Sequence, residues 1–444
     1  MASLQRLLGK SFSIAACIGL VIGLGILRTP GEIATTVSDP VPYMALWIGC
    51  GFFALLSVLV VAELIAMTPR SGGIYALVRH AYGRYPGFLI GWTDWISGCA
   101  TLALKTVVLV EYVALLVPVA EAHQVALRVG ITSAFALMQL AGTRTSAGVQ
   151  RVASAGIGLI IFALAIALYY GFFVNKGVVD VPVQAGAIRA PGMAALGLVV
   201  ASVVFTYDGW YAASYFSGEV KSGGRSVAIG SIQGALIIMA LYVALNLALV
   251  LSVPLLAIAG NKLALAGALE LVFGAGAGTL IVGAAIFILL AHQNLQYMMI
   301  SRILYSLSVD GLGLAKATSV NERGAPAGAM IISWLTVVAL VIAGQFAFLL
   351  NMVTILFMAM YVSLVIGVFR LRRSEPDAER PFKAWGFPAT GVICALGWTV
   401  IALFVAVSNP ESAISGAALV IISAPVYLWL RRYRHLDENE VAEA

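Results

Sequence analysis

The sequence predicts an all-α integral membrane protein with twelve transmembrane helices, from its composition and the length of its apolar runs. Of its 444 residues, 61% are hydrophobic and only 10% are charged. A soluble domain carries roughly 25% charged residues, so this chain is too apolar to form a wetted globular surface. Its apolar runs reach or exceed the ~20 residues with which a helix crosses a bilayer.

Charged or turn-rich breaks divide the chain into twelve apolar runs, and each run is a predicted span. The runs cover residues 11–37, 42–68, 86–118, 125–141, 150–174, 192–217, 226–252, 268–306, 326–344, 346–370, 386–408 and 412–430. We interpret the first run as a retained span rather than a signal peptide, because no A-x-A cleavage site follows it.

The positions of lysine and arginine orient these spans. Most of them fall in loops on the side of the N-terminus, whereas the opposite side holds only Arg128, Lys176, Arg189 and Lys262. Positively charged loops stay in the cytoplasm, so we expect a multi-pass protein of the cell (inner) membrane with both termini cytoplasmic. The net charge of +6 does not indicate nucleic-acid binding, because no basic helix with interleaved aromatic residues occurs.

The four cysteines, Cys17, Cys50, Cys99 and Cys394, all fall within apolar runs and lack metal-ligand spacing. They are typical of small buried hydrophobic residues. We therefore expect no metal, no cofactor and no obligatory disulfide-linked partner.

The first span is interrupted at Gly23 and Gly25, in the stretch VIGLGILRTPG. Unpaired backbone groups are costly in hydrocarbon, so irregular backbone at this depth is found where it lines a cavity or is buried in protein. We expect a half-helix that begins near Ile26 to direct its free N–H groups at that cavity, where they suit a carboxylate. The carbonyls that end the preceding half-helix suit an ammonium group or a cation.

The sixth span contains a second interruption, because Asp208-Gly209 is a turn dipeptide with an acid inside an apolar helix. Interrupted helices at matching positions of two five-helix halves indicate a five-plus-five inverted-repeat fold with a binding site at the midplane. The alternative is that the glycines only allow close helix packing. We expect one transmembrane domain over 1–444, with repeat one at about 11–174, repeat two at about 192–370 and peripheral helices at about 386–430.

Four ordered motifs resemble those of the amino acid–polyamine–organocation (APC) superfamily, nearest its bacterial amino acid permeases and light-chain-type exchangers. They are IGLGILRTPG, AELIAMTPRSGGIY, FTYDGWYAASYFSGEVK and SRILYSLSVDG, which begin at residues 22, 62, 205 and 301. The resemblance covers spans one to ten. It implies a secondary active transporter, a permease that moves amino acids by alternating access, with discontinuous helices one and six.

The resemblance also implies binding positions. The carboxylate of the solute would meet the amides of Leu24 and Gly25, and its amino group the carbonyls of Val21, Phe205 and Asp208. The full set of candidate substrate-binding residues is Val21, Gly23, Leu24, Gly25, Ile26, Phe205, Tyr207, Asp208, Gly209 and Trp210. Leu24 replaces a small residue of the family and narrows the site. Ile157 stands where many relatives have a lysine that substitutes for sodium.

Two charged residues are candidates for coupling or gating. Lys105 lies deep in the third span, where a lysine costs at least ~2.5 kcal/mol. It either carries a proton, replaces a bound cation, or bridges carbonyls of a broken helix. Arg28 lies on the outward half of the first span, where it either gates the outer vestibule, attracts the carboxylate of the solute, or is a structural or snorkelling side chain.

Three further polar residues complete the candidates. Glu111 follows Lys105 by six residues and points roughly 120° away from it, so we expect no direct pair. Asn294 belongs to the polar cluster His292–Gln293–Asn294 of the eighth span, of which at least one member faces the interior. We expect the Asp208 carboxylate to cap the N–H groups near Trp210 and Tyr211.

These observations favour transport of neutral L-amino acids, by exchange or by proton symport. A polyamine or organic cation is the alternative within the same fold, but it would require several carboxylates in the cavity. A membrane enzyme is disfavoured because the four histidines form no HxxxH or HExxH pair. A channel is disfavoured because the paired broken helices do not resemble a pore with a ring of charges.

Overall fold

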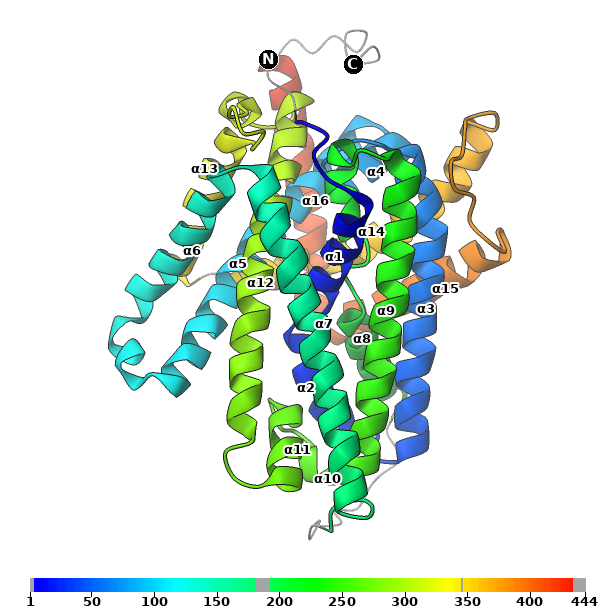
Figure 1. Cartoon of the computed structure of the whole chain (residues 1–444). Helices are drawn as coiled ribbons and strands as arrows, with labels where there is room; N and C mark the ends of the chain where they lie inside the picture. Colours follow the sequence, from blue (N-terminus) through cyan, green and yellow to red (C-terminus); the bar gives the residue numbers. More distant parts are fainter. Residues whose placement is uncertain (1–3, 181–191, 345, 434–444) are drawn as a thin grey trace.

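The chain is mainly helical in the residues that the computed structural model describes, namely 4–180, 192–344 and 346–433 (Figure 1). The α-helices are α1 (Lys10–Val21), α2 (Leu24–Ala34), α3 (Pro40–Met67), α4 (Ile74–Tyr82), α5 (Arg84–Leu116), α6 (Gln124–Leu140), α7 (Thr143–Val174), α8 (Met193–Thr206), α9 (Gly223–Ser252), α10 (Leu255–Ile258), α11 (Ala264–Phe273), α12 (Gly278–Val309), α13 (Ala327–Ala343), α14 (Phe346–Ser374), α15 (Ala389–Ser408) and α16 (Pro410–Tyr433). Three 3-10 helices join them: η1 (Pro118–His123), η2 (Ala212–Glu219) and η3 (Ala315–Thr318).

Many of these helices are suited to a bilayer. Within the described residues eight are long and apolar enough to cross a membrane, and a ninth span results when the bent pair α1–α2 counts as one. Shorter apolar helices occur at Ala195–Thr206, Ala264–Phe273 and Ala327–Ala343. The expectation of a multi-pass helical protein is confirmed, whereas the count of twelve spans and the inverted repeat stay predictions.

Two helical segments differ from the predicted spans. Residues 268–273, assigned to the start of the eighth span, belong to the separate helix α11. Gly274 ends α11 with a φ of 91° and Gly276 follows with a φ of 94°, which turns the chain before α12 begins. The short amphipathic helix α4 was not expected, and it is bounded by Gly73 and Gly83, both of which have positive φ.

The core of the molecule surrounds α1, which contacts α7, α9, α12 and η2. Seven of its twelve residues are buried. By contrast, α7, α15 and α16 present large exposed apolar residues, among them Leu159, Val407 and Ile421. Such a surface is expected of helices that face lipid. The bundle therefore encloses a central broken helix within a ring of lipid-exposed ones.

The described chain begins and ends at the same end of the bundle, at the top of Figure 1. This end carries α4, and the opposite end carries α10 and α11. Arg189, one of the four basic residues assigned to the opposite side, lies outside the described residues.

Candidate functional site: a cavity at two helix breaks

The first break separates α1 from α2 by a bend of 41°. Gly23 precedes α2 with extended backbone, and no side chain caps the helix there. A Cβ atom at Gly23 would lie 3.0 Å from Cε1 of His292, so a glycine is needed here for close approach rather than for its φ angle. The first N–H groups of α2 are thus free of side-chain caps, and a helix start of this kind attracts anions.

The second break lies between α8 and η2. Helix α8 ends at Thr206, and Gly209 has a φ of 113°, which side chains other than hydrogen rarely allow. A Cβ atom at Gly209 would also lie 3.0 Å from Cγ of Leu20 in α1. The two breaks therefore lie against each other, as the sequence predicts for its two interrupted spans.

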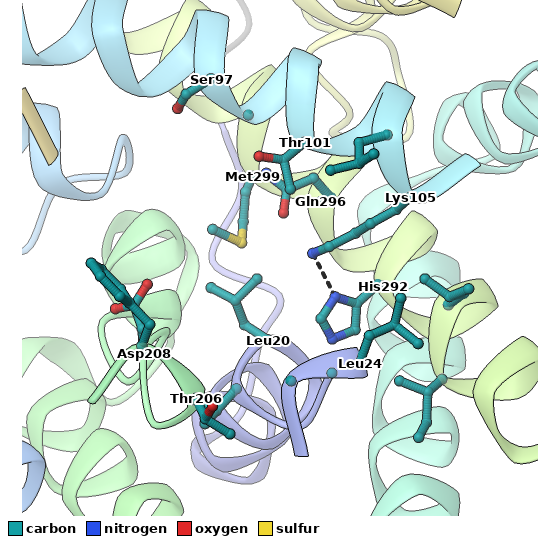
Figure 2. A pocket seen from close by; sticks show the side chains of 18 of the residues that line it. Leu20, Leu24, Ser97, Thr101, Lys105, Thr206, Asp208, His292, Gln296 and Met299 are labelled. Atoms are coloured by element: carbon teal, nitrogen blue, oxygen red, sulfur yellow. Dashed lines mark hydrogen bonds between the residues drawn. The ribbon is translucent and has the colours of Figure 1, made fainter. Parts of the chain in front are cut away.

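A cavity of about 520 Å³ opens between the two breaks and is walled by α5, α12 and α14 (Figure 2). This volume is within the range of about 300–1,000 Å³ that small-molecule sites occupy. Its polar lining residues are Arg28, Asp94, Ser97, Thr101, Lys105, Thr206, Asp208, Tyr211, Tyr215, His292 and Gln296.

One side of the cavity is basic. Nζ of Lys105 lies 2.7 Å from Nδ1 of His292, and Nε2 of the same ring lies 3.1 Å from the carbonyl oxygen of Ile22. Ile22 is the residue at which the first span breaks. Side chains of α5 and α12 therefore meet the broken helix through one line of hydrogen bonds, which Figure 2 shows in part.

The other side is acidic. The Asp208 carboxylate accepts hydrogen bonds from the hydroxyl of Tyr361, at 2.5 Å, and of Tyr211, at 3.4 Å. Asp94 accepts a hydrogen bond from the hydroxyl of Tyr215 at 2.8 Å. The predicted capping role of Asp208 is wrong, because no side chain caps η2 and tyrosines take up the carboxylate instead.

Six of the ten candidate substrate-binding residues line the cavity: Val21, Gly23, Leu24, Gly25, Phe205 and Asp208. The other four, Ile26, Tyr207, Gly209 and Trp210, are outside its lining. The Tyr207 side chain points away from the cavity, and its hydroxyl donates to the carbonyl of Trp47. Trp210 is buried behind Tyr211 and Tyr361, with ring centroids 5.5 and 6.4 Å away.

Two of the four candidates for coupling or gating line the cavity, and the other two do not. Lys105 and Arg28 line the cavity, and Arg28 is exposed and pairs with Glu32 of its own helix at 2.6 Å. Glu111 is exposed and outside the cavity lining. Asn294 is buried elsewhere, among α6, α7 and α12, where Gln139 donates to it at 2.6 Å and it donates to Gln150 at 2.8 Å.

The sequence analysis did not identify most of the residues of α5 and α12 that line the cavity. In α5 the lining residues recur every three or four positions, at Asp94, Ser97, Gly98, Thr101, Leu104, Lys105, Val108 and Tyr112. In α12 they recur at Ile288, Leu289, His292, Gln296 and Met299. This is the period of one helix face. The polar members of the two stripes are the signal that could have identified these walls.

Several ion pairs lie at the end of the bundle that carries the termini. Glu219 of η2 and Arg302 of α12, both buried, form a bidentate pair with both N–O distances at 2.9 Å. Asp310 contacts Arg70 and Arg79 and accepts a hydrogen bond from Tyr75. Burial and the Asp310 carboxylate raise the pKa of the Tyr75 hydroxyl well above its ordinary value. Four charged residues of the recognised motifs, Arg70, Glu219, Arg302 and Asp310, thus pair at this end, whereas Arg28 and Asp208 line the cavity.

Comparisons with known proteins agree with this architecture. The profile of the amino acid permease family matches residues 10–428. The b(0,+)-type amino acid transporter 1 of Mus musculus is 24% identical over 97% of this chain and 89% of its own length. The serine/threonine exchanger SteT of Bacillus subtilis is 24% identical over 69% of this chain and 68% of its own. The methylthioribose transporter of Bacillus subtilis is 28% identical over 88% of this chain and 87% of its own.

The family profile and the transporters among the relatives define the class as a membrane transporter rather than an enzyme. The chain belongs to the amino acid permease family of the APC superfamily. The resemblance of the four motifs to this superfamily is thereby confirmed.

Proposed function

We propose that this protein is a secondary active transporter that moves neutral L-amino acids across the cell membrane by alternating access. The observation that carries the proposal is the polarity of the cavity. Its basic side holds Lys105 and the uncapped start of α2, and its acidic side holds Asp94 and Asp208. A zwitterionic amino acid fits this arrangement, because its carboxylate can face the basic side while its ammonium group faces the acidic side.

The orientation of the solute follows from the helix ends. Its carboxylate would accept hydrogen bonds from the amides of Leu24 and Gly25 at the start of α2. Its ammonium group would face Asp208 and the carbonyls of Val21 and Phe205. The Val21 carbonyl already accepts a hydrogen bond from Tyr242 at 3.0 Å, but a carbonyl has a second lone pair to offer.

The proposal also covers the mode of transport and the orientation of the protein in the membrane. Exchange and proton symport are both compatible with a cavity that contains one lysine and two carboxyl groups. Arg28 lines the cavity and has an exposed side chain, which suits a gate. The termini are proposed to be cytoplasmic from the distribution of lysine and arginine. No disulfide-linked partner is proposed, since the four cysteines are buried.

The second candidate is transport of an amine or organic cation. It is favoured by the two carboxyl groups in the cavity, those of Asp94 and Asp208. It is opposed by Lys105, which places a positive charge in the same cavity.

Counterflow into proteoliposomes tests the proposal. Vesicles are loaded with one unlabelled solute and then receive a trace of the same labelled solute, in turn L-serine, L-threonine, L-leucine, L-lysine, putrescine and methylthioribose. We expect transient accumulation of at least one neutral amino acid and none of putrescine, with protein-free vesicles as the control. Accumulation of putrescine or methylthioribose without any amino acid would contradict the proposal. A proton gradient imposed on empty vesicles then separates symport from exchange.

A further inference from the structure

Lys105 is a basic side chain in the cavity for which the structure shows no acidic partner. Within residues 4–180, 192–344 and 346–433, none of the ion pairs includes it. Its nitrogen instead lies 2.7 Å from Nδ1 of His292. An ammonium group has three N–H donors and no lone pair, so Nδ1 accepts one hydrogen bond and the other N–H groups stay available.

His292 fixes the position of that ammonium group. With Nδ1 as acceptor, a neutral ring carries its proton on Nε2, which then donates to the Ile22 carbonyl at 3.1 Å. The ring also lies against Gly23, where a Cβ atom would be 3.0 Å from Cε1. His292, and not Lys105, therefore donates the hydrogen bond to the Ile22 carbonyl at the break. The ammonium group of Lys105 is not needed for this contact.

Lys105 and α2 place two positive elements in one wall of the cavity. The start of an α-helix carries a charge equivalent to roughly +0.5, and here no side chain neutralises it. Gly23 and Leu24 line the same cavity as Lys105. In Figure 2, Lys105 and His292 lie on the side of Leu24, and Asp208 lies on the opposite side of the view.

Among the described residues no carboxylate forms an ion pair with this wall, although Asp208 attracts the charge of Lys105. Asp208 is held by Tyr361 and Tyr211, and Asp94 by Tyr215. Arg28, the other cation of the cavity, pairs with Glu32 outside its lining. A solute with an anionic group would supply the missing charge.

We propose that Lys105 binds the carboxylate of the transported solute together with the amides of α2, and that His292 positions Lys105 for this contact. The inference rests on the proposed function and narrows it. The transported solutes carry an anionic group, and Lys105 is a specificity-determining residue that rejects the corresponding decarboxylated amines.

Matched pairs of ligands test this inference on the purified full-length protein. Thermal unfolding is followed by tryptophan fluorescence in the presence of L-serine or ethanolamine, L-leucine or isoamylamine, and L-lysine or cadaverine. Each pair differs by one carboxylate. We expect stabilisation by at least one amino acid and none by its amine, and this comparison needs no variant.

Variants then assign the preference to Lys105. In Lys105→Met we expect the affinity for the amino acid to fall roughly 10- to 100-fold, the value of a charge-assisted hydrogen bond. The affinity for the amine should stay the same or rise, because a like charge has been removed. Lys105→Arg keeps the charge and should lose less.

A matched pair of variants tests the role of His292. His292→Gln retains one acceptor for Lys105 and one donor for Ile22, whereas His292→Leu retains neither. We expect His292→Gln to keep more of the amino acid affinity than His292→Leu. Equal losses in both variants would overturn the positioning role.

The outcomes separate this inference from the proposed function. If wild-type protein exchanges amino acids but Lys105→Met keeps the wild-type preference over amines, the inference alone is overturned. If an amine or methylthioribose stabilises the wild type and no amino acid does, both fail together, because none of these ligands carries a carboxylate.

Discussion

Gly23 shows how the absence of one side chain determines the geometry of the cavity. Its backbone is extended, which any residue can adopt, so its φ angle does not require glycine. The requirement comes from the ring of His292, because its Cε1 atom would lie only 3.0 Å from a Cβ atom at this position. The helix break and the position of the imidazole ring therefore depend on each other.

Gly23→Ala is expected to lower the initial rate of counterflow roughly 10-fold or more. The added methyl group displaces His292 and weakens its hydrogen bonds to Ile22 and Lys105. The rate is measured in proteoliposomes with the solute that the wild type exchanges. Gly158→Ala is the matched control, because a Cβ atom there meets nothing within 4 Å. Equal rates in the two variants would contradict the prediction.

Asn294 is a buried polar residue whose hydrogen bonds indicate a structural role. It is fully buried and joins α12 to Gln139 of α6 and Gln150 of α7. Asn294→Leu would remove the side-chain hydrogen bonds to both amides, and the Oε1 atom of Gln150 would lose its donor. We expect the free energy of unfolding to fall by about 1–3 kcal/mol.

Thermal unfolding and ligand affinity together check this prediction. Asn294 is outside the cavity lining, so the affinity for the transported solute should not change. Loss of coupling to a proton gradient at unchanged stability would instead support the coupling role that the sequence proposed for Asn294.

An ion pair joins η2 to α12 at the end of the bundle that carries the termini. Glu219 ends η2, and Arg302 reaches it from the C-terminal part of α12 through a buried bidentate pair. The first described residues add to this junction, since the amide of Leu8 donates to the Glu219 carbonyl at 2.9 Å. The second half of the broken sixth span is thereby fixed to α12 and to the N-terminal segment.

Arg302→Met is expected to lower the free energy of unfolding by about 3–5 kcal/mol, because the charge of Glu219 would stay buried without an opposite charge beside it. The double variant Glu219→Leu with Arg302→Met should lose less than the sum of the two single variants. The comparison is made by thermal unfolding as a double-mutant cycle. Additive losses would show that the pair contributes no net coupling.

The whole molecule has an asymmetric charge distribution that predicts its orientation in the membrane. A cysteine introduced at Lys176 should react with a membrane-impermeant maleimide added to intact cells. A cysteine at Arg144 should react only after the cells are opened. The four native cysteines are buried, so the background should be low. The reverse pattern of labelling would show the opposite orientation.

The sequence alone determined the class of protein and the location of the two breaks. Composition and run length are properties of each segment by itself, so they predict membrane helices without knowledge of their neighbours. Glycine pairs and an Asp-Gly dipeptide within apolar runs are equally local, and they located the breaks at Gly23 and Gly209.

The tertiary structure decided which polar side chains meet. Lys105 and His292 are 187 residues apart in sequence, and Asp208 and Tyr361 are 153 apart. Each contact depends on how far one helix is rotated against another, which the packing of the whole bundle determines. For this reason the sequence singled out Lys105, Asp208 and the cluster at His292, but only the fold brought Lys105 to His292, took Tyr207 and Trp210 out of the cavity, and placed Asn294 elsewhere.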